Sequence, residues 1–286
     1  MVAAVSVPFP AWQAHPEVWL LVGFFAVGYA LALRRLGPRL APAGTPVATR
    51  FQITSYSAGV FALWIASDWP IHDIAERYLF SVHMLQHVSY SIVAAPLMLI
   101  GTPTWLARWL LSPRWLQAAV RYLSRLIPAT IVFNLVIIVT HTPIVVNAAL
   151  EHALVHFGIH TLIFVSALIV WMPLLSPLPE VPRLQPLARL LFLFLQSVVP
   201  TVPASFLTFG AHPLYSFYDH VPRLFGVSAL NDMQIAGVVM KLGVGLTIWL
   251  IIAILFFRWY NAEEAQSPAK RVSRDLEREL MGLRQS

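Results

Sequence analysis

Long apolar stretches separated by short polar segments run along almost the whole chain. A helix that spans a lipid bilayer needs roughly 20 consecutive residues that are mostly apolar. Seven stretches approach this length: Val18 to Leu33, Phe51 to Ser67, Tyr78 to Ile100, Ile127 to Val146, Ala153 to Leu175, Leu187 to Phe209 and Asp232 to Phe257. The pattern predicts an all-α polytopic membrane protein, a seven-transmembrane-helix bundle at residues 18–258. Residues 1–17 would form an outer N-terminal segment, and residues 259–286 a charged cytoplasmic tail.

The basic residues predict how these spans are oriented. Lys and Arg concentrate in the short loops on the cytoplasmic side of a membrane protein. Of the 19 basic residues, sixteen fall on one side of the predicted spans: Arg34, Arg35, Arg39, Arg50, Arg108, Arg114, Arg121, Arg125, Arg183, Arg189, Arg258, Lys270, Arg271, Arg274, Arg278 and Arg284. The other side holds only Arg77 and Arg223, and Lys241 lies within the seventh span. We therefore expect the N-terminus outside and the C-terminus inside.

Composition agrees with a membrane protein and excludes several kinds of site. Only 11% of the residues are charged, against about 25% in soluble domains, so the lipid bilayer is the expected surroundings. There is no cysteine, which excludes disulfides, thiolate zinc sites, iron–sulfur clusters and a cysteine nucleophile. The net charge of +6 could suggest a nucleic-acid binder, but the basic residues lie between apolar stretches, so we expect no nucleic-acid partner.

Ten histidines are the unusual feature of the composition, because they nearly equal the 13 acidic residues. On the predicted topology all ten lie on the non-cytoplasmic side: His15, His72, His83, His87, His141, His152, His156, His160, His212 and His220. Ionisable groups at membrane depth are costly and usually functional. The histidines therefore mark the outer half of the bundle as the place to look for a site.

Two groups of histidines repeat the four-residue spacing of one helix face. His83 and His87 project from one side of the third span, about 6 Å apart in height. His152, His156 and His160 form a column about 12 Å tall on the fifth span. Because His87 and His160 lie at similar depths, a site shared between these spans is geometrically reasonable. A single histidine in a membrane commonly packs as a hydrogen-bonding group, but two such groups favour a metal, haem or proton role.

The available donor atoms narrow the choice of metal. Imidazole suits copper, zinc, iron and nickel. Without a thiol, a site built from histidine, with or without methionine, favours copper or haem iron over structural zinc. Ligation needs neutral imidazole, so binding should weaken as the pH falls through the histidine range near 6.5.

Other polar groups occupy the spans near the histidines. Asp232 and Gln234 begin the seventh span, and Lys241 lies one heptad further along nearly the same face. Lys241 could extend to the interface, pair with a carboxylate or tune a metal site. Asn134 and Gln196 are expected to join helices by hydrogen bonds.

An ordered set of short motifs resembles a known family. The motifs are His83-Met84-Leu85-Gln86-His87, Ala95-Pro96-Leu97, Gly101-Thr102-Pro103, His141-Thr142-Pro143, Glu151-His152 through His160, Trp171-Met172-Pro173-Leu174 and Asp232-Met233-Gln234-Ile235-Ala236-Gly237. From about residue 15 to 260 the chain resembles the CtaG-like family of cytochrome c oxidase assembly factors. This is the polytopic kind tied to caa-type oxidases, not the single-span copper chaperone with the same abbreviation.

The resemblance implies a role in making a haem–copper oxidase. Members are seven-helix proteins of the bacterial plasma membrane, and copper delivery is the usual proposal for them. We therefore expect an assembly factor, not an enzyme, that holds copper, with Cu(I) favoured, and passes it to an oxidase subunit. The expected ligands are His83, His87, His156 and His160, with His141 and His152 as accessory ligands and Asp232, Gln234 and Lys241 beside them.

Two other functions stay open at this point. A membrane redox enzyme could use the histidines for haem or a di-iron centre, although the chain has no adjacent His-His pair, which di-iron membrane hydroxylases typically contain. A metal or proton transporter would need ligands that continue toward the cytoplasmic half, where only Lys241 is ionisable within a span. The sequence does not decide the oligomeric state, and a homo-oligomer is possible.

Overall fold

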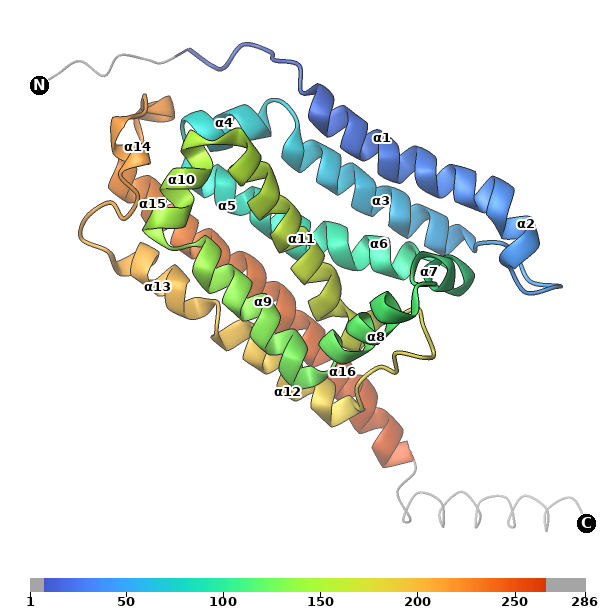
Figure 1. Ribbon diagram of the computed structural model, residues 1–286. Helices are drawn as coiled ribbons and strands as arrows, with labels where there is room; N and C mark the ends of the chain where they lie inside the picture. Colours follow the sequence, from blue (N-terminus) through green and yellow to red (C-terminus); the bar gives the residue numbers. More distant parts are fainter. Residues whose placement is uncertain (1–7, 266–286) are drawn as a thin grey trace, which may run out of the picture.

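The computed structural model describes residues 8–265, which are helical with no strand (Figure 1). The first part of the chain forms α1 (Pro16–Leu31), the π-helical η1 (Ala32–Leu36), α2 (Gly37–Leu40), α3 (Arg50–Ser67), α4 (Ile71–Arg77), α5 (Phe80–Val88), the π-helical η2 (Ser89–Ala94), α6 (Ala95–Gly101), α7 (Thr104–Leu110), α8 (Arg114–Leu123) and α9 (Leu126–Thr140). There follow α10 (Pro143–Glu151), α11 (Ala153–Leu175), α12 (Pro186–Val198), α13 (Thr201–Phe209), α14 (Phe217–His220), the 3₁₀-helical η3 (Leu224–Gly226), α15 (Ala229–Val238), the π-helical η4 (Val239–Val244) and α16 (Gly245–Ala265). Most of the predicted charged tail lies outside the described residues.

Several continuous helical segments are long and apolar enough to cross a bilayer. Within residues 8–265 there are five: Pro16–Leu40, Phe80–Gly101, Ala153–Leu175, Pro186–Phe209 and Ala229–Ala265. The bent pair α8 and α9, with 87° between the two helices, is a sixth candidate. α3 coincides with the second predicted span but is not among these candidates. The structure thus supports a polytopic helical membrane protein with five to six candidate spans, and the count of seven and the orientation stay predictions.

Local sequence signals explain where several helices begin. At the start of α3, the Thr49 hydroxyl accepts the backbone N–H of Gln52, and the Gln52 side chain accepts the N–H of Thr49, which is a capping box. At the start of α15, the Ser228 hydroxyl accepts the N–H of Asn231. Proline occupies the first turn of α1, α10 and α12, where its missing N–H costs nothing.

The fourth predicted span ends earlier than expected. We predicted helix as far as Val146, but α9 ends at Thr140 and α10 begins at Pro143. Proline disfavours helical geometry in the preceding residue, and Thr142 is extended, with ψ 145°. The break leaves His141 at the C-terminal end of α9, and this position proves important for the site.

The helix α5–η2–α6 runs through the middle of the bundle, between α3 on one side and α11 and α15 on the other. Glycine lets two pairs of helices approach closely. A Cβ atom on Gly59 of α3 would lie 3.0 Å from the carbonyl oxygen of Ala94, and one on Gly237 of α15 would lie 2.7 Å from that of Ala204 on α13. These close approaches hold the central helix against α3 and hold α15 against α13.

A polar contact also joins α9 to α12 inside the bundle. The Asn134 amide donates to Gln196 Oε1 at 3.0 Å, and the Gln196 amide donates to Thr130 Oγ1 at 3.1 Å. Both Asn134 and Gln196 are buried. The predicted interhelical role of these two residues is confirmed.

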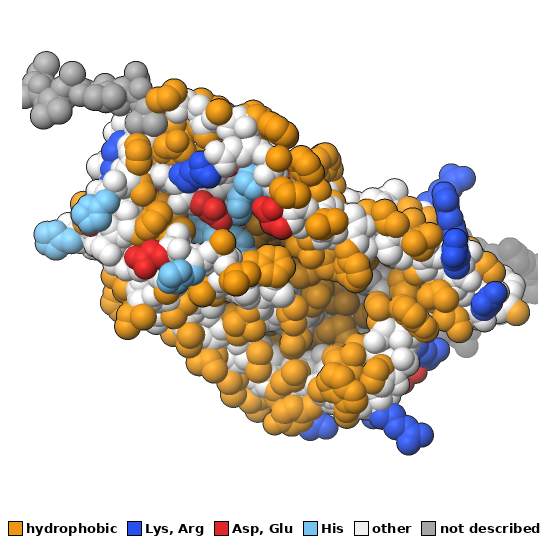
Figure 2. Space-filling model, turned by 45° about the horizontal axis from the view of Figure 1, so that its top comes forward, with side chains coloured by type: hydrophobic (Ala, Val, Ile, Leu, Met, Phe, Trp, Pro, Cys, Tyr) orange, Lys and Arg blue, Asp and Glu red, His pale blue; other side chains and the backbone are white. Residues whose placement is uncertain are grey.

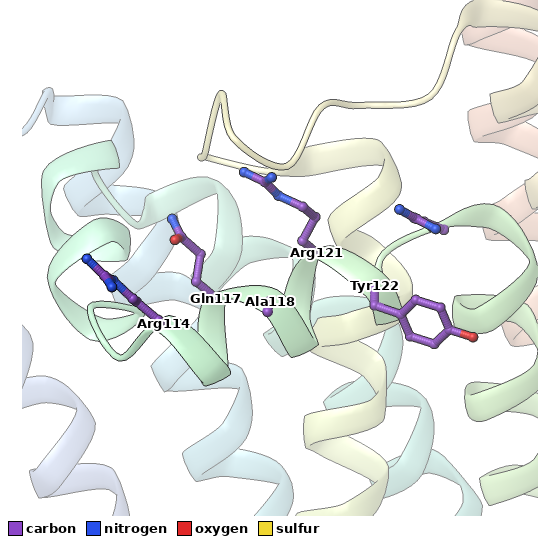
Figure 3. A pocket seen from close by; sticks show the side chains of 6 residues that line it. Arg114, Gln117, Ala118, Arg121 and Tyr122 are labelled. Carbon is purple, nitrogen blue, oxygen red and sulfur yellow. The ribbon is translucent and has the colours of Figure 1, made fainter.

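The two ends of the bundle differ in the ionisable side chains that they carry. Figure 2 shows histidine and acidic side chains gathered at one end of the visible face and most Lys and Arg side chains at the other. At the basic end, Arg114, Gln117 and Arg121 extend from one side of α8 (Figure 3), and the helix has no buried residue. A helix with one strongly basic side is typical of the membrane–water interface.

Candidate metal centre

Five of the six predicted histidine ligands meet at one place in the structure. His83 and His87 come from α5, His156 and His160 from α11, and His141 from the break after α9. The ring centroids of His83 and His87 are 4.5 Å apart, those of His87 and His160 4.9 Å, and those of His87 and His141 5.5 Å. We call these five residues the histidine cluster.

Three members of the cluster are arranged as a possible ion site. One ring nitrogen from each of His83, His87 and His160 lies within 4.8 Å of the other two. Nitrogens that share a tetrahedral ion through bonds of about 2.0–2.1 Å lie about 3.3 Å apart. Small rotations of the side chains would therefore bring the three nitrogens onto one ion.

Several ring nitrogens in the cluster are buried without a partner. Among the described residues these are His83 Nδ1, both ring nitrogens of His87 and His141 Nε2. Buried polar atoms in proteins are nearly always hydrogen-bonded, because an unpaired one costs about 1–3 kcal/mol. Each neutral imidazole has one lone pair, and the other nitrogen of His87 carries a proton. A metal ion would accept one lone pair from each of these three rings, so the residues present fit an ion held by imidazole.

His141 is held so that one nitrogen faces the cluster. Its Nδ1 lies 2.7 Å from the carbonyl oxygen of Ile137. A carbonyl only accepts, so Nδ1 carries the proton and the lone pair is on Nε2. The hydroxyl of Tyr215 donates to the His141 carbonyl at 3.0 Å and holds the backbone there. His141 thus presents a lone pair on the atom that has no other partner.

His156 connects the cluster to an acidic residue that the sequence did not single out. His156 Nδ1 lies 2.5 Å from Glu76 Oε1, and the same oxygen lies 3.1 Å from His72 Nε2. Glu76 and His72 stand four residues apart on α4, a spacing that could have indicated the pair. The next acid on α4, Asp73, accepts from His15 Nε2 at 2.9 Å. A row of imidazoles and carboxylates therefore extends outward from the cluster.

The charges of this outer row follow from burial and from its ion pairs. Burial raises the pKa of Glu76, but the hydrogen bond from His156 and the neighbouring histidines outweigh burial and hold it below the usual range. Burial lowers the pKa of His72, and the Glu76 carboxylate only partly offsets this. Burial also lowers the pKa of His15, but Asp73 and Glu17 together more than offset burial and the pKa is raised.

Two cavities of very different size lie next to the histidines. Among His83, His87, His141 and His156 there is a cavity of only about 10 Å³, which is about the room that one water-sized sphere needs. Beside the cluster lies a cavity of about 540 Å³ whose polar lining includes His72, Glu76, His156 and His160, and whose other walls are apolar residues of α1, α3 and α11. The cluster itself has room for an ion and not for a porphyrin.

The sixth predicted ligand lies apart from the cluster. His152 is exposed and extended, with φ −131° and ψ 106°, just before α11 begins at Ala153. The predicted helical column of three histidines is therefore a column of two, because the helix starts one residue after His152. His212 and His220 are also exposed.

The three other predicted residues have separate positions. Asp232 is fully buried, and its carboxylate accepts the N–H groups of Phe80 and Ser81 at 2.6 and 3.1 Å, at the start of α5. It therefore supports the helix that carries His83 and His87 without touching either ring. The Gln234 amide donates to the carbonyl of Gly210 at 3.3 Å. Lys241 is exposed on η4, with Nζ 5.6 Å from the centroid of the Phe209 ring.

Comparison with known proteins identifies one family. A family model described as cytochrome c oxidase caa3 assembly factor, Caa3_CtaG, matches residues 27–262 of this chain. That range contains the whole histidine cluster and the row from His72 to Glu76. No curated protein and no solved structure matches the chain.

Proposed function

The chain belongs to the caa3-type cytochrome c oxidase assembly factor family, and we propose that it binds Cu(I) at the histidine cluster and delivers it to a subunit of a haem–copper oxidase. The observation that carries this proposal is the convergence of ring nitrogens from His83, His87 and His160 within 4.8 Å. The unpaired nitrogens of His83, His87 and His141 support it. Copper is the ion that the protein carries to the oxidase, and the histidine cluster holds it until delivery.

The surroundings of the cluster favour a monovalent ion. The described ion site consists of neutral imidazoles, and His83, His87 and His141 are all buried. Glu76, which contacts the cluster through His156, supplies one negative charge. Burying charge beyond what is balanced is expensive, and the cost rises with the square of the net charge. Cu(I) therefore costs far less to bury here than a divalent ion, and imidazole is a suitable ligand for copper.

The position of the cluster supports delivery on the non-cytoplasmic side of a bacterial plasma membrane. The histidines lie at the end of the bundle opposite to most of the basic residues (Figure 2), and basic residues concentrate in cytoplasmic loops. An oxidase subunit that receives copper on that side would meet the polar end of the bundle. The role requires binding and release of an ion, with no catalysed reaction.

Haem is a poorer fit than copper. The cluster rings leave a cavity of only about 10 Å³ between them. The acids that line the larger cavity beside the cluster, Glu17 and Glu76, bind His15, His72 and His156, and they leave those histidines less available to the propionates of a haem. The structure offers no comparable conflict for a small cation.

Copper content of the purified protein tests the proposal. Wild type and the double variant His83→Ala/His87→Ala are loaded with Cu(I) under reducing conditions, freed of unbound metal and analysed for copper per chain. The matched control is His212→Ala/His220→Ala, which removes two exposed imidazoles. We expect copper in wild type and control, and loss in the cluster variant. Equal copper in all three proteins would refute this site.

A further inference from the structure

We propose that Glu76 is a positioning residue of the metal centre, which orients His156 so that its Nε2 joins the ion as a further ligand. This inference rests on copper binding by the cluster and assigns a role to an acid outside it. Glu76 lies on the short helix α4, and His156 lies on α11. Their contact is therefore made by the tertiary structure alone.

The first step is the proton on His156. Its Nδ1 lies 2.5 Å from Glu76 Oε1, and the two side chains are 7% and 31% exposed. A carboxylate can only accept a hydrogen bond, so Nδ1 donates and carries the proton. A neutral imidazole has one proton, and the lone pair of His156 is therefore on Nε2.

The second step is the direction of that lone pair. His156 Nε2 lies 2.8 Å from His160 Nε2, so it faces the cluster and not the outer row. With the proton of His156 on Nδ1, the hydrogen bond in the metal-free protein is donated by His160 Nε2–H to the lone pair of His156 Nε2. When an ion binds between the two rings, the proton of His160 moves to its Nδ1. A shared tetrahedral ion needs a separation of about 3.3 Å, which a small rotation of either ring supplies.

The third step is the place of His156 relative to the rest of the cluster. The ring centroids of His83 and His156 are 5.3 Å apart, the same separation as for His83 and His160. His156 is therefore as close to His83 as His160 is, while His160 also contacts His87, with ring centroids 4.9 Å apart. With Glu76 on Nδ1 and the ion on Nε2, it forms a carboxylate–histidine–metal arrangement, which fixes the ring and strengthens the ligand.

Glu76 is itself held in place. The oxygen that accepts from His156 also lies 3.1 Å from His72 Nε2, four residues earlier on α4. Glu17 lines the same cavity but binds His15 Nδ1 at 3.3 Å and is 59% exposed. Glu17 therefore contributes the same charge to the cavity without touching the cluster, and it offers a matched control.

Copper affinity is the first measurement. Wild type, Glu76→Gln, Glu76→Ala and Glu17→Gln are titrated with Cu(I) against a chromophoric Cu(I) chelator, and the fold of each is checked by its melting temperature. Glutamine keeps an acceptor for Nδ1 but loses the charge, and alanine loses both. We expect Glu76→Ala to weaken binding by about 10- to 100-fold, Glu76→Gln to be intermediate, and Glu17→Gln to equal wild type.

The proton position is the second measurement, and it needs no metal. In metal-free protein labelled with ¹⁵N-histidine, the nitrogen chemical shifts report which ring nitrogen of His156 is protonated, and His156→Gln identifies its signals. We expect protonated Nδ1 in wild type and a mixture of forms in Glu76→Ala. Protonated Nε2 in wild type would overturn the proposal, as would wild-type copper affinity in Glu76→Ala or an equal loss in Glu17→Gln.

These results separate the two proposals. A wild-type protein that holds no more copper than His83→Ala/His87→Ala refutes the proposed function and the role of Glu76 with it. Copper binding that depends on His83 and His87 but not on Glu76 refutes the positioning role alone.

Discussion

Replacing Asp232 by alanine should disable the metal centre although Asp232 touches none of its ligands. Its side chain is 0% exposed. Its carboxylate accepts the N–H of Phe80 at 2.6 Å, the N–H of Ser81 at 3.1 Å and the hydroxyl of Ser81 at 2.5 Å. The first N–H groups of a helix have no partner within the helix. Asp232 of α15 thus supplies the partners for the start of α5.

The size of the effect follows from the groups left behind. Alanine would leave unpaired the buried N–H of Phe80 and the partly buried N–H and hydroxyl of Ser81. A buried unpaired group costs about 1–3 kcal/mol, and a partly buried one costs less. A carboxylate near a helix N-terminus adds about 0.3–1 kcal/mol or more through the helix dipole. Because the three groups can form hydrogen bonds with one another in part, their costs do not add in full. We expect a loss of about 3–5 kcal/mol in the free energy of unfolding. His83 lies two residues beyond Ser81, so fraying of this turn displaces it.

Hydrogen exchange and copper titration check this prediction together. In Asp232→Ala the amides of Phe80 and Ser81 should exchange faster, the melting temperature should fall, and Cu(I) affinity should drop. Asp219→Ala, at an exposed acid, is the control and should change stability by less than about 0.5 kcal/mol. Unchanged exchange at Phe80 and Ser81 in Asp232→Ala would show that the carboxylate does not hold α5.

Three further predictions concern other parts of the molecule. Burial lowers the pKa of His15, but Asp73 and Glu17 together raise it above the usual 6.5. The stabilisation by these ion pairs, in which Asp73 has the larger part, is complete below pH 6.5 and is lost as the pH rises through the raised pKa. The melting temperature of Asp73→Asn should therefore fall further below that of wild type at pH 6 than at pH 9, and an equal difference at both would contradict this. Gly237→Ala should lose about 1–3 kcal/mol in denaturation experiments, because its Cβ would lie 2.7 Å from the carbonyl oxygen of Ala204. Gly245→Ala has nothing within 4 Å and should be neutral, so equal losses would argue against close helix packing. Finally, the visible spectrum of the purified protein should contain no Soret band, and a strong one would favour haem.

The sequence predicted which segments are helical and which helix faces carry the histidines, because both depend on residues that are close together along the chain. Apolar stretches longer than a bilayer core identify helices that tolerate lipid. The four-residue spacing of His83 and His87, and of His156 and His160, places each pair on one face of a helix. The buried contact between Asn134 and Gln196 could also be expected, because amide side chains within membrane spans form hydrogen bonds between helices.

Helix boundaries at the end of the bundle that carries the histidines were less predictable. The apolar pattern continues through His141 and Pro143, so the fourth span was placed too far, and the break at Pro143 was missed. The pattern likewise joined His152 to the column on α11, although the helix begins after it. Hydrophobicity reports which residues avoid water, and it does not report where the backbone turns.

The contacts between elements were decided by the tertiary structure alone. Glu76 and Asp73 lie on a short helix whose position depends on packing against distant segments, such as the bond from the Tyr218 hydroxyl to the carbonyl of Ala75 at 2.7 Å. No local pattern says that α4 meets α11, or that Asp232 meets the start of α5. The sequence by itself therefore determined a helical membrane protein with histidines on two helix faces. Only the folded bundle decided which histidines converge and which carboxylates hold them, because those contacts join residues far apart along the chain.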